Sequence, residues 1–368
     1  MDELCRLDRD EMTAEAGGGG RCARLTAGYV LPSYDLSSLL ESFGIRLFTR
    51  ERTLSQYVVW SLEAGLIELL AKRRAVRLGE ATAETTLTES GADSLLGVLC
   101  ALGLVSRAVD GCYSLTDAGR AYLLSDSPFF IADQIEAVGP AIPPPYLKQR
   151  ASFLTRMKLK MAFSRPIFRF GSRTRIANQH ARNLVACATA VRTGEFSEVG
   201  CLVDLAGGSG VFAIPLALEY PDKRIVLTEL PEALPNVQPL LVEHGVEGRV
   251  ELLGLDALRF PWRIPECDGI FIGNFLHGFD DETCRRVCRE SFERLGRGGK
   301  LWIHEMIWNE CRDGPLMTAL WHAAMRSAGP GGQRTGRELS AFLESAGFSQ
   351  TRIVPTAGAY ALICGLKA

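Results

Sequence analysis

Short apolar runs alternate with amphipathic stretches over residues 196–368. Six runs have the length and apolar content of buried strands: "CLVDLA", "RIVLTE", "VELLGL", "GIFIGNFL", "KLWIHEMI" and "YALICGL". Helical patterns separate most of them, which is typical of a doubly wound, mostly parallel α/β sheet. Such Rossmann-like sheets bind ligands beyond the carboxyl ends of their strands, where the strand order reverses. We therefore expect a ligand-binding domain over residues 196–368.

Over residues 31–140 the pattern predicts helices and a small hairpin. "LSQYVVWSLEAGLIELLA" and "ADSLLGVLCALGLVSR" have apolar residues at helical spacing. "AVDGCYSLT" predicts a strand, a turn at Asp110 and Gly111, and a second strand, followed by Thr116 as a helix N-cap. Together these elements predict a winged-helix-like domain. Its candidate recognition helix is apolar with almost no Lys or Arg, so a buried or subunit-facing helix is favoured over DNA binding.

Two other segments complete the predicted organisation. Residues 1–30 are expected to be a disordered leader, because the first twenty are acidic and glycine-rich without the apolar stretch of a signal peptide. Residues 141–195 are expected to be connecting helices that line a substrate pocket. Residues 137–194 contain no Asp or Glu but eleven Lys and Arg. This basic segment forms either a solvated face or an attractive surface for a carboxylate or phosphate.

The composition argues against several classes of protein. A net charge of -2 over 368 residues does not fit a general nucleic-acid binder. No apolar run reaches the roughly 18–20 residues of a membrane span. Eleven cysteines without CxxC pairs indicate reduced thiols and a cytoplasmic location rather than a disulfide framework.

The stretch "DLAGGSG" lies between the first strand and a helix. Its three glycines, Gly207, Gly208 and Gly210, permit a tight turn and close approach of a ligand to the backbone. The pattern departs from the G-x-G-x-x-G of dinucleotide-binding folds. Glu229 ends the second strand, where it can accept hydrogen bonds from both ribose hydroxyls, and Asp256 ends the third, where it can accept one from an adenine amino group.

An acidic residue just ahead of the glycines narrows the choice of ligand. Asp204 would repel a pyrophosphate, whereas it would attract the ammonium of an amino acid. A ribose, an adenine and a cationic amino-acid end together indicate S-adenosylmethionine (SAM).

Seven motifs give the chain a family resemblance. "LVDLAGGSG", "LTELPEAL", "GLDAL", "NFLHGFDDETC", "GRGGKLWIHEMI", "GPGGQRT" and "FLESAGF" resemble the SAM-dependent O-methyltransferases with an N-terminal winged-helix dimerisation domain. That family includes plant caffeate and flavonoid enzymes and bacterial natural-product enzymes. The resemblance covers roughly residues 50–368 and implies a homodimer with interlocked N-terminal domains. The implied cofactor-binding residues are Asp204, Gly207, Gly208, Gly210, Glu229 (Asp in the family), Leu230, Asp256, Ala257 and Asn274.

The resemblance also implies a catalytic base. His277 in "FLHGFDDETC" occupies the place of the family's general base, although Gly278 and Phe279 replace an Asp-Trp pair. A phenol with a pKa near 10 needs such a base at neutral pH. Glu305 in "LWIHEMI" matches the glutamate that orients this histidine. Gln333 in "GGQRT" is the third catalytic candidate. It stands where plant members have a second glutamate, and an amide can hydrogen-bond but holds no charge.

Substrate contacts are expected from two helices. By register with "IANQHARN", Asn178 and Arg182 fall at the pocket, where Arg182 would clamp a carboxylate or phosphate; a surface position for Arg182 is the alternative. The helix in "PLMTALWHAAMRSAG" supplies four further candidates, each with a packing role as its alternative: Leu320, Trp321, Ala324 and Met325.

No metal site is expected. His277, His304 and His322 lack close ligand spacing, so a site formed by these three is the weaker alternative. His304 is expected instead to be a buried histidine bonded to a backbone carbonyl.

The sequence therefore predicts a SAM-dependent methyltransferase that acts on a hydroxyl of a small molecule. We expect this molecule to be aromatic, and the basic segment allows it to be anionic. Methyl transfer to carbon or nitrogen by the same fold is the first alternative, because an electron-rich ring carbon also needs a base. A non-catalytic SAM-binding regulatory protein that contacts DNA is the second. The expected partners are the substrate and a second copy of the chain, without nucleic acid or membrane.

Overall fold

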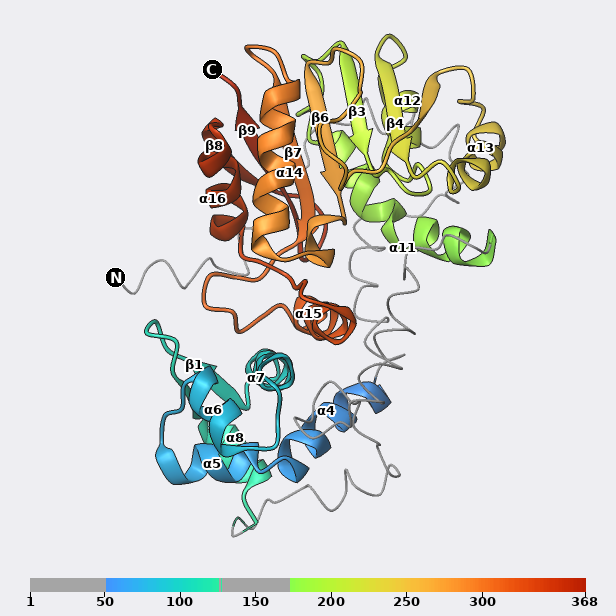
Figure 1. Cartoon of the computed structure of the whole chain (residues 1–368). Coiled ribbons are helices and arrows are strands. Elements are labelled where there is room, and N and C mark those ends of the chain that lie inside the picture. Colours follow the sequence, from blue (N-terminus) through green and yellow to red (C-terminus); the bar gives the residue numbers. More distant parts are fainter. Residues whose placement is uncertain (1–50, 126, 128–172) are drawn as a thin grey trace, which may run out of the picture.

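The computed structural model describes residues 51–125, 127 and 173–368 (Figure 1). The predicted leader and the basic segment up to residue 172 lie outside the described residues. None of the helices in the described ranges combines the length and apolar content that a bilayer crossing requires.

The N-terminal unit consists of short helices around a two-stranded hairpin (Figure 1). Strands β1 and β2 are antiparallel, and Gly111 has the positive φ, 83°, that their turn requires. The Thr116 hydroxyl accepts a hydrogen bond from the Gly119 amide, which confirms the predicted N-cap. The assignment as a winged-helix dimerisation domain stays a prediction. The elements are α4 (Glu51–Glu63), α5 (Leu66–Arg73), α6 (Leu78–Glu84), α7 (Glu89–Ala101), β1 (Val105–Arg107), β2 (Tyr113–Leu115) and α8 (Asp117–Leu123).

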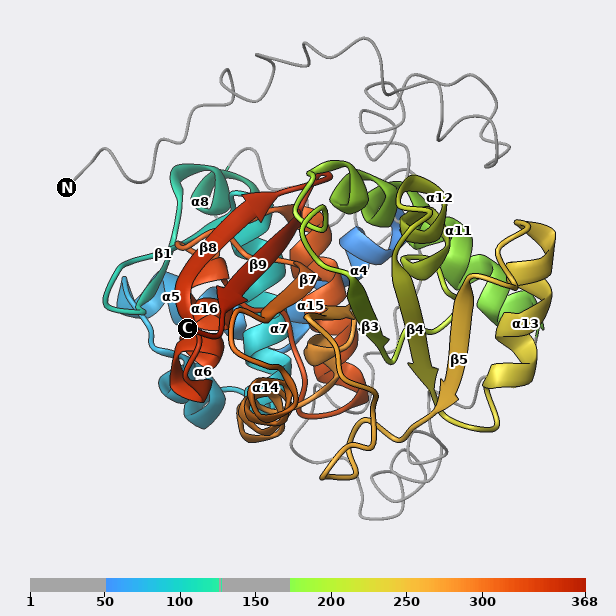
Figure 2. The same ribbon diagram turned by 90° about the horizontal axis from the view of Figure 1, so that it is seen from above.

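A seven-stranded sheet in the order β5-β4-β3-β6-β7-β9-β8 forms the second unit (Figure 2). Neighbouring strands from β5 to β7 are parallel, whereas β9 runs antiparallel to both of its neighbours. The six predicted strands are all present. The strands are β3 (Cys201–Leu205), β4 (Arg224–Glu229), β5 (Val250–Gly254), β6 (Gly269–Gly273), β7 (Lys300–Met306), β8 (Ser349–Pro355) and β9 (Tyr360–Leu366).

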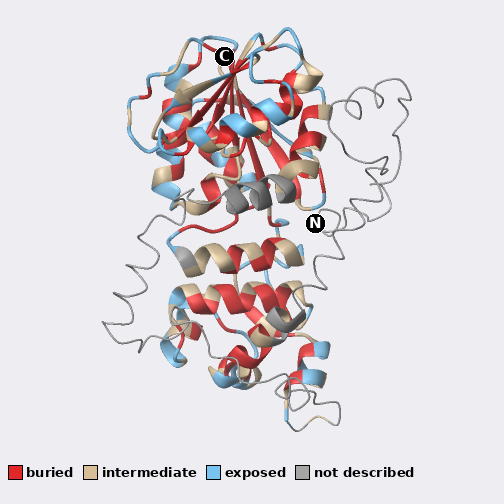
Figure 3. Cartoon of the chain, turned by 90° about the vertical axis from the view of Figure 1, so that its right-hand side faces the viewer, coloured by how far each residue is buried: buried red, intermediate tan, exposed pale blue. Residues whose placement is uncertain are grey.

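Helices cover both faces of the sheet, and two hydrophobic clusters lie between the layers. Successive residues of β3 show the division: Leu202 packs in the cluster that includes α11, α12 and α13, whereas Val203 packs in the cluster that includes α14 and α16. The inner strands of the sheet are almost entirely buried, whereas the edge strands β5 and β8 are more exposed (Figure 3). The helices are α11 (Arg173–Arg192), α12 (Ala213–Glu219), α13 (Leu234–Glu243), α14 (Asp281–Arg294), α15 (Leu316–Ala328) and α16 (Gly336–Ala346).

Helix α15 joins the two units because it packs along α7 (Figure 1). The candidate recognition helix is therefore buried, as expected from its composition; Leu95, Leu96 and Leu99 of α7 are fully buried. A single hydrophobic cluster contains residues of α4, α5 and α7 together with Leu320 and Ala323 of α15.

Candidate active site

The glycine turn folds back on the end of strand β4. The Gly207 amide donates a hydrogen bond to the Thr228 carbonyl at 2.9 Å. A Cβ atom at position 207 would lie 2.6 Å from Oδ2 of Asp204 and 2.8 Å from Cγ of Leu227, so only glycine fits here. Gly208 and Gly210 have positive φ angles of 59° and 75°. The turn therefore brings bare backbone to the carboxyl ends of β3 and β4.

Asp204 lies beneath this turn at the end of β3. Its side chain is 1% exposed, and Oδ2 has no hydrogen-bond partner within the part of the chain that the structure describes. Burial, together with the nearby charge of Glu229, raises the pKa of Asp204 to about 8. The carboxyl group is therefore mostly protonated at neutral pH, and a cation placed beside it would favour its ionised form.

Glu229 ends β4 as predicted and is nearly buried. Its Oε2 accepts a hydrogen bond from the Gly208 amide at 3.1 Å, and its Oε1 accepts one from the Leu230 amide at 2.9 Å. Burial raises its pKa, and the two amide bonds act against this shift. Each oxygen has two acceptor positions, so the carboxylate can also accept hydrogen bonds from a ligand.

A cavity of about 300 Å³ opens at the carboxyl ends of β3 to β6. Eight of the nine predicted cofactor residues line it: Asp204, Gly207, Gly208, Glu229, Leu230, Asp256, Ala257 and Asn274. Gly210 is not among the lining residues. The Asp256 side chain is more exposed than those of Asp204 and Glu229 and pairs with Arg259 at 3.2 Å.

Aromatic and α11 residues complete the cavity, and the sequence did not single them out. Phe212 and Phe271 stack with centroids 3.4 Å apart and contribute to the lining. Asn183 and Cys187 line it from α11. Their separation of four residues places them on one helix face, a spacing that could have identified them.

His277 and Glu305 form a buried pair. His277 lies in a one-turn 3-10 helix after β6 (η3, Leu276–Gly278), and Glu305 lies near the end of β7. Nδ1 of His277 is 2.7 Å from Oε2 of Glu305, as the sequence predicts for an orienting glutamate. Oε1 accepts hydrogen bonds from the amides of Phe275 (2.9 Å) and His277 (3.3 Å). One carboxylate thus holds both the ring and the backbone, and Nδ1–H directed at it leaves Nε2 as the proton acceptor.

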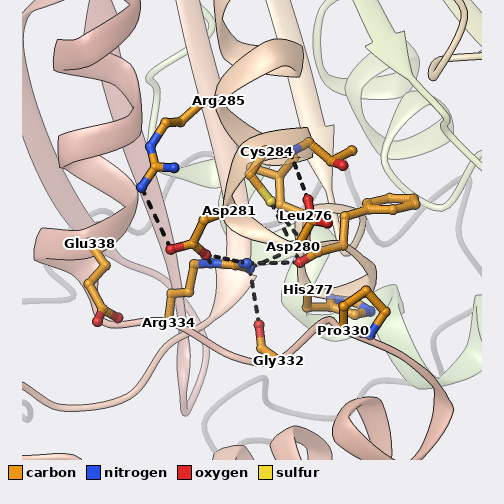
Figure 4. Close-up of polar contacts among 12 residues, drawn as sticks. Leu276, His277, Asp280, Asp281, Cys284, Arg285, Pro330, Gly332, Arg334 and Glu338 are labelled. Carbon is orange, nitrogen blue, oxygen red and sulfur yellow. Dashed lines mark hydrogen bonds and ion pairs between the residues drawn. The ribbon is translucent and has the colours of Figure 1, made fainter.

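Arg334 holds the turn that carries His277 (Figure 4). Its Nη1 donates to the carbonyls of Leu276 (3.2 Å) and Gly332 (3.1 Å), and its Nη2 donates to the Phe279 carbonyl (2.8 Å). Nη2 also lies 2.8 Å from Oδ1 of Asp281. Arg334 therefore fixes the chain on both sides of His277, a role for which its sequence motif gave no signal.

Gln333 is buried beside this turn. Its amide donates a hydrogen bond to Nδ1 of His322 at 3.0 Å, and its Nε2 has no hydrogen-bond partner among the described residues. No hydrogen bond joins Gln333 to His277 within the described ranges. The catalytic role expected of Gln333 stays a prediction.

The predicted substrate residues have different environments. Asn178 and Arg182 lie on α11, but their side chains are outside the described residues. The Trp321 ring stands edge-on to His277 with centroids 6.1 Å apart, and its Nε1 is buried without a partner in the described chain. Leu320 packs in the cluster shared with the N-terminal unit. Ala324 and Met325 are half-buried.

The expectation for His304 was wrong in one respect. Nε2 of this fully buried histidine is 3.0 Å from the Thr356 hydroxyl, whereas the sequence predicted a backbone carbonyl as its partner. The polar partner is thus a side chain, that of Thr356, which lies 52 positions from His304 in the sequence. Burial lowers the pKa of His304 to about 4. Among the described residues, no group of three His, Cys, Asp or Glu could hold a metal ion.

The chain is similar to known O-methyltransferases. Residues 168–349 match the family described as an O-methyltransferase domain. A 3-hydroxy-5-methyl-1-naphthoate 3-O-methyltransferase of Streptomyces sahachiroi is 26% identical over 332 residues, which cover 85% of this chain and 92% of the relative. An acetylserotonin O-methyltransferase of Gallus gallus is 30% identical over 45% of this chain. That match spans about half, 47%, of the chicken enzyme.

Two solved structures share the fold. An O-methyltransferase family 2 protein from Planctomyces limnophilus, in complex with apigenin, has a TM-score of 0.72 at 24% identity and covers 92% of this chain and 97% of its own. Human N-acetylserotonin methyltransferase, in complex with SAM, has a TM-score of 0.53 at 21% identity and covers 92% and 99%. The predicted fold class, a mostly parallel methyltransferase sheet, is confirmed.

Proposed function

Because residues 168–349 match the O-methyltransferase domain family, we propose that this chain is a SAM-dependent O-methyltransferase that methylates a hydroxyl of a small aromatic molecule with His277 as the general base. The observation that carries this proposal is the buried pair of His277 and Glu305, with Nδ1 2.7 Å from Oε2. The carboxylate determines which ring nitrogen is free to accept a proton.

The cavity residues fit SAM as the cofactor. The unpartnered Oδ2 of Asp204 suits an ammonium group, and Glu229 at the end of β4 suits ribose hydroxyls. Asp256 would accept a hydrogen bond from the adenine amino group. The absence of a Cβ at Gly207 leaves the turn open toward the ligand. Bound SAM supplies a methyl group on a positively charged sulfur, so the protein has no leaving group to activate.

The remaining chemistry belongs to His277 and Glu305. His277 would accept the hydroxyl proton at Nε2, because Glu305 already binds Nδ1. The negative carboxylate would then stabilise the resulting imidazolium. Glu305 also holds the backbone amides of Phe275 and His277, so the ring is fixed before substrate binds.

We place the substrate among aromatic hydroxy acids. The Streptomyces sahachiroi relative is named for a hydroxynaphthoate, which has a hydroxyl and a carboxylate on one aromatic system. The basic composition of residues 137–194 provides cationic side chains for such a carboxylate, with Arg182 as the candidate clamp. The chain would act as a homodimer, as the family resemblance implies.

Product analysis with His277→Ala tests the function. With hydroxynaphthoates and related phenolic acids as substrates, NMR of the product should show the new methyl group on oxygen, and a methyl group on a ring carbon would contradict the proposal. We expect His277→Ala to lower kcat by about 10²–10⁴-fold, the usual contribution of a general base, whereas a loss below about tenfold would reject this assignment. His244→Ala, at the end of α13, is the matched control and should keep full activity.

A further inference from the structure

We propose that His322 is a positioning residue for methyl transfer, which couples helix α7 of the N-terminal unit to the loop that holds His277. This inference rests on the proposed function, since it assumes that His277 is the base. The loop comprises residues 329–335 and is called the 329–335 loop below.

His322 lies between two partners from distant parts of the chain. Its side chain, on α15, is 5% exposed. Nδ1 accepts a hydrogen bond from the Gln333 amide at 3.0 Å, and Nε2 is 2.9 Å from Oδ2 of Asp93 on α7. A backbone amide can only donate, so Nδ1 has to carry the lone pair. The proton is therefore on Nε2 and points at the Asp93 carboxylate, and a single neutral tautomer satisfies both contacts.

The 329–335 loop transmits this contact to the catalytic base. The Gly332 amide donates to the His277 carbonyl at 2.8 Å, and Arg334 donates to the carbonyls of Leu276 and Phe279 (Figure 4). The residue that His322 holds, Gln333, thus stands between the two residues that hold the His277 turn. A Cβ atom at position 332 would lie 2.9 Å from Cε1 of His322, so glycine at this position allows the ring to approach the loop.

Packing from α7 keeps His322 in place. Nε of Arg326 is 3.4 Å from Oδ2 of Asp93, and the Ser90 hydroxyl donates to the Arg326 carbonyl at 2.8 Å. The Trp308 ring meets the His322 ring edge-on with centroids 5.5 Å apart. These contacts fasten α15 to α7, so the position of the N-terminal unit determines where the His322 ring lies.

The cofactor cavity is separate from the contacts that link α7, His322 and the 329–335 loop. Its lining residues within the described chain include none from α7, α15 or the 329–335 loop. A change at His322 should therefore alter the alignment of His277, and with it kcat, while the affinity for SAM stays constant. A residue that only stabilised the fold would not separate these two quantities in this way.

Two polar variants test separately the two hydrogen bonds of His322, one with the Gln333 amide and one with Asp93. His322→Asn keeps an acceptor at the place of Nδ1 but does not reach Asp93, whereas His322→Gln keeps a donor at the place of Nε2 but lacks the Nδ1 acceptor. We expect His322→Gln and His322→Ala to lose about 10–100-fold in kcat, the scale of a small misplacement of a catalytic group. His322→Asn, which keeps the loop contact and loses only the contact with Asp93, should have a kcat between those of the wild type and His322→Ala. The KM for SAM should be unchanged in all three variants.

Asp93→Asn is the control for the hydrogen bond between His322 and Asp93. Its amide oxygen can still accept the Nε2–H of His322, so kcat should stay within about threefold of the wild type. The inference would be overturned if His322→Gln or His322→Asn retained the wild-type kcat, or if His322→Asn were as slow as His322→Ala. These outcomes are distinguishable from failure of the proposed function, in which His277→Ala itself would remain active.

A measurement on the wild-type enzyme keeps the test independent of how the variants fold. ¹⁵N NMR of the histidine-labelled protein should show an unprotonated Nδ1 and a protonated Nε2 for His322 at neutral pH. The His322 resonances are assigned by their loss in His322→Asn. A proton on Nδ1 would exclude the hydrogen bond from Gln333 and reject the inference.

Discussion

At the scale of single residues, Asp204 is unusual because it is a buried carboxyl group with an unpartnered oxygen. Its pKa is raised to about 8 by burial and by Glu229. The free protein therefore holds a proton on Asp204 at pH 7. Pairing with the ammonium of SAM would require the ionised carboxylate, so cofactor binding should release that proton.

The first prediction is that the affinity for S-adenosylhomocysteine depends on pH. Between pH 6 and 8 it should rise by up to roughly tenfold per pH unit as Asp204 loses its competing proton. At still higher pH it should fall, as the ligand's own α-amino group loses its charge. Calorimetry at pH 7 in two buffers of different ionisation enthalpy should show release of nearly one proton. Asp204→Asn should bind more weakly and release none, and proton-free binding by the wild type would contradict the prediction.

The second prediction concerns Glu305, which serves both the base and the fold. Glu305→Ala leaves the amides of Phe275 and His277 without their buried acceptor, and each unsatisfied group should cost about 1–3 kcal/mol of unfolding free energy. Glu305→Gln keeps an acceptor oxygen but loses the charge. We therefore expect both variants to be slow and only Glu305→Ala to be markedly destabilised, as measured by kcat and by denaturant unfolding. Equal stability losses would show that the carboxylate charge, not the acceptor oxygen, holds the turn.

At the scale of elements, the unit of strand β3, glycine turn and helix α12 builds the cofactor cavity. The turn is crowded on one side and open on the other: a Cβ at Gly207 would overlap Asp204 and Leu227, whereas one at Gly208 would meet no atom within 4 Å. Gly208 needs its positive φ, while Gly207 needs its small size.

The third prediction follows from this crowding. Gly207→Ala should displace Asp204 and weaken the binding of S-adenosylhomocysteine, with a lower melting temperature as well. Gly248→Ala is the matched control, because a Cβ there would meet no atom within 4 Å and its φ is not positive, so both quantities should stay at wild-type values. Calorimetry and thermal unfolding measure them. Wild-type binding by Gly207→Ala would show that the turn can accommodate a Cβ atom and still bind the ligand.

The elements themselves were largely predictable from local sequence. Strands β3, β4, β6 and β7 are buried apolar runs, and this pattern identified them. Strand β8 was missed, because Ile353 and Val354 are its main apolar residues and it pairs on one side only. An exposed edge strand has little hydrophobic signal, and its pairing with β9 determines its conformation.

At the scale of the whole molecule, the two units share one hydrophobic cluster. Residues of α4, α5 and α7 pack together with Trp308 and with Leu320 of α15. Leu320 was a candidate substrate residue with packing as its alternative, and its place in this cluster supports the alternative.

The fourth prediction is that the N-terminal unit and the methyltransferase domain unfold together. Leu320→Ala on α15 and Leu99→Ala on α7 should each lower the unfolding free energy by about 2–5 kcal/mol, the cost of a cavity in a core. Calorimetry should show a single transition in the wild type and in both variants. For Leu320→Ala the KM for the substrate should not change, and a rise in that KM would instead favour its role as a substrate contact.

The order of the glycine turn and the acidic strand ends was enough to predict the cofactor, whereas the pair of His277 and Glu305 was predicted from the family resemblance. Asp204 and Glu229 lie at the ends of strands β3 and β4 and Asp256 lies just after β5, and the carboxyl ends of parallel strands meet at one edge of the sheet. Local pattern thus determined the cofactor and its approximate place. The substrate is less determined, because Arg182 and Asn178 depend on how α11 is oriented.

The sequence by itself determined the sheet, the glycine turn and the acidic strand ends, since each depends on residues close together in the chain. Only the tertiary structure decided that Asp93 bonds His322, which is 229 positions away, and that Arg334 encloses the His277 turn. No local pattern encodes such contacts, because they arise when α15 packs on α7 and brings the 329–335 loop against η3. Elements follow from the short-range periodicity of apolar residues, whereas the support of the catalytic base follows from long-range packing.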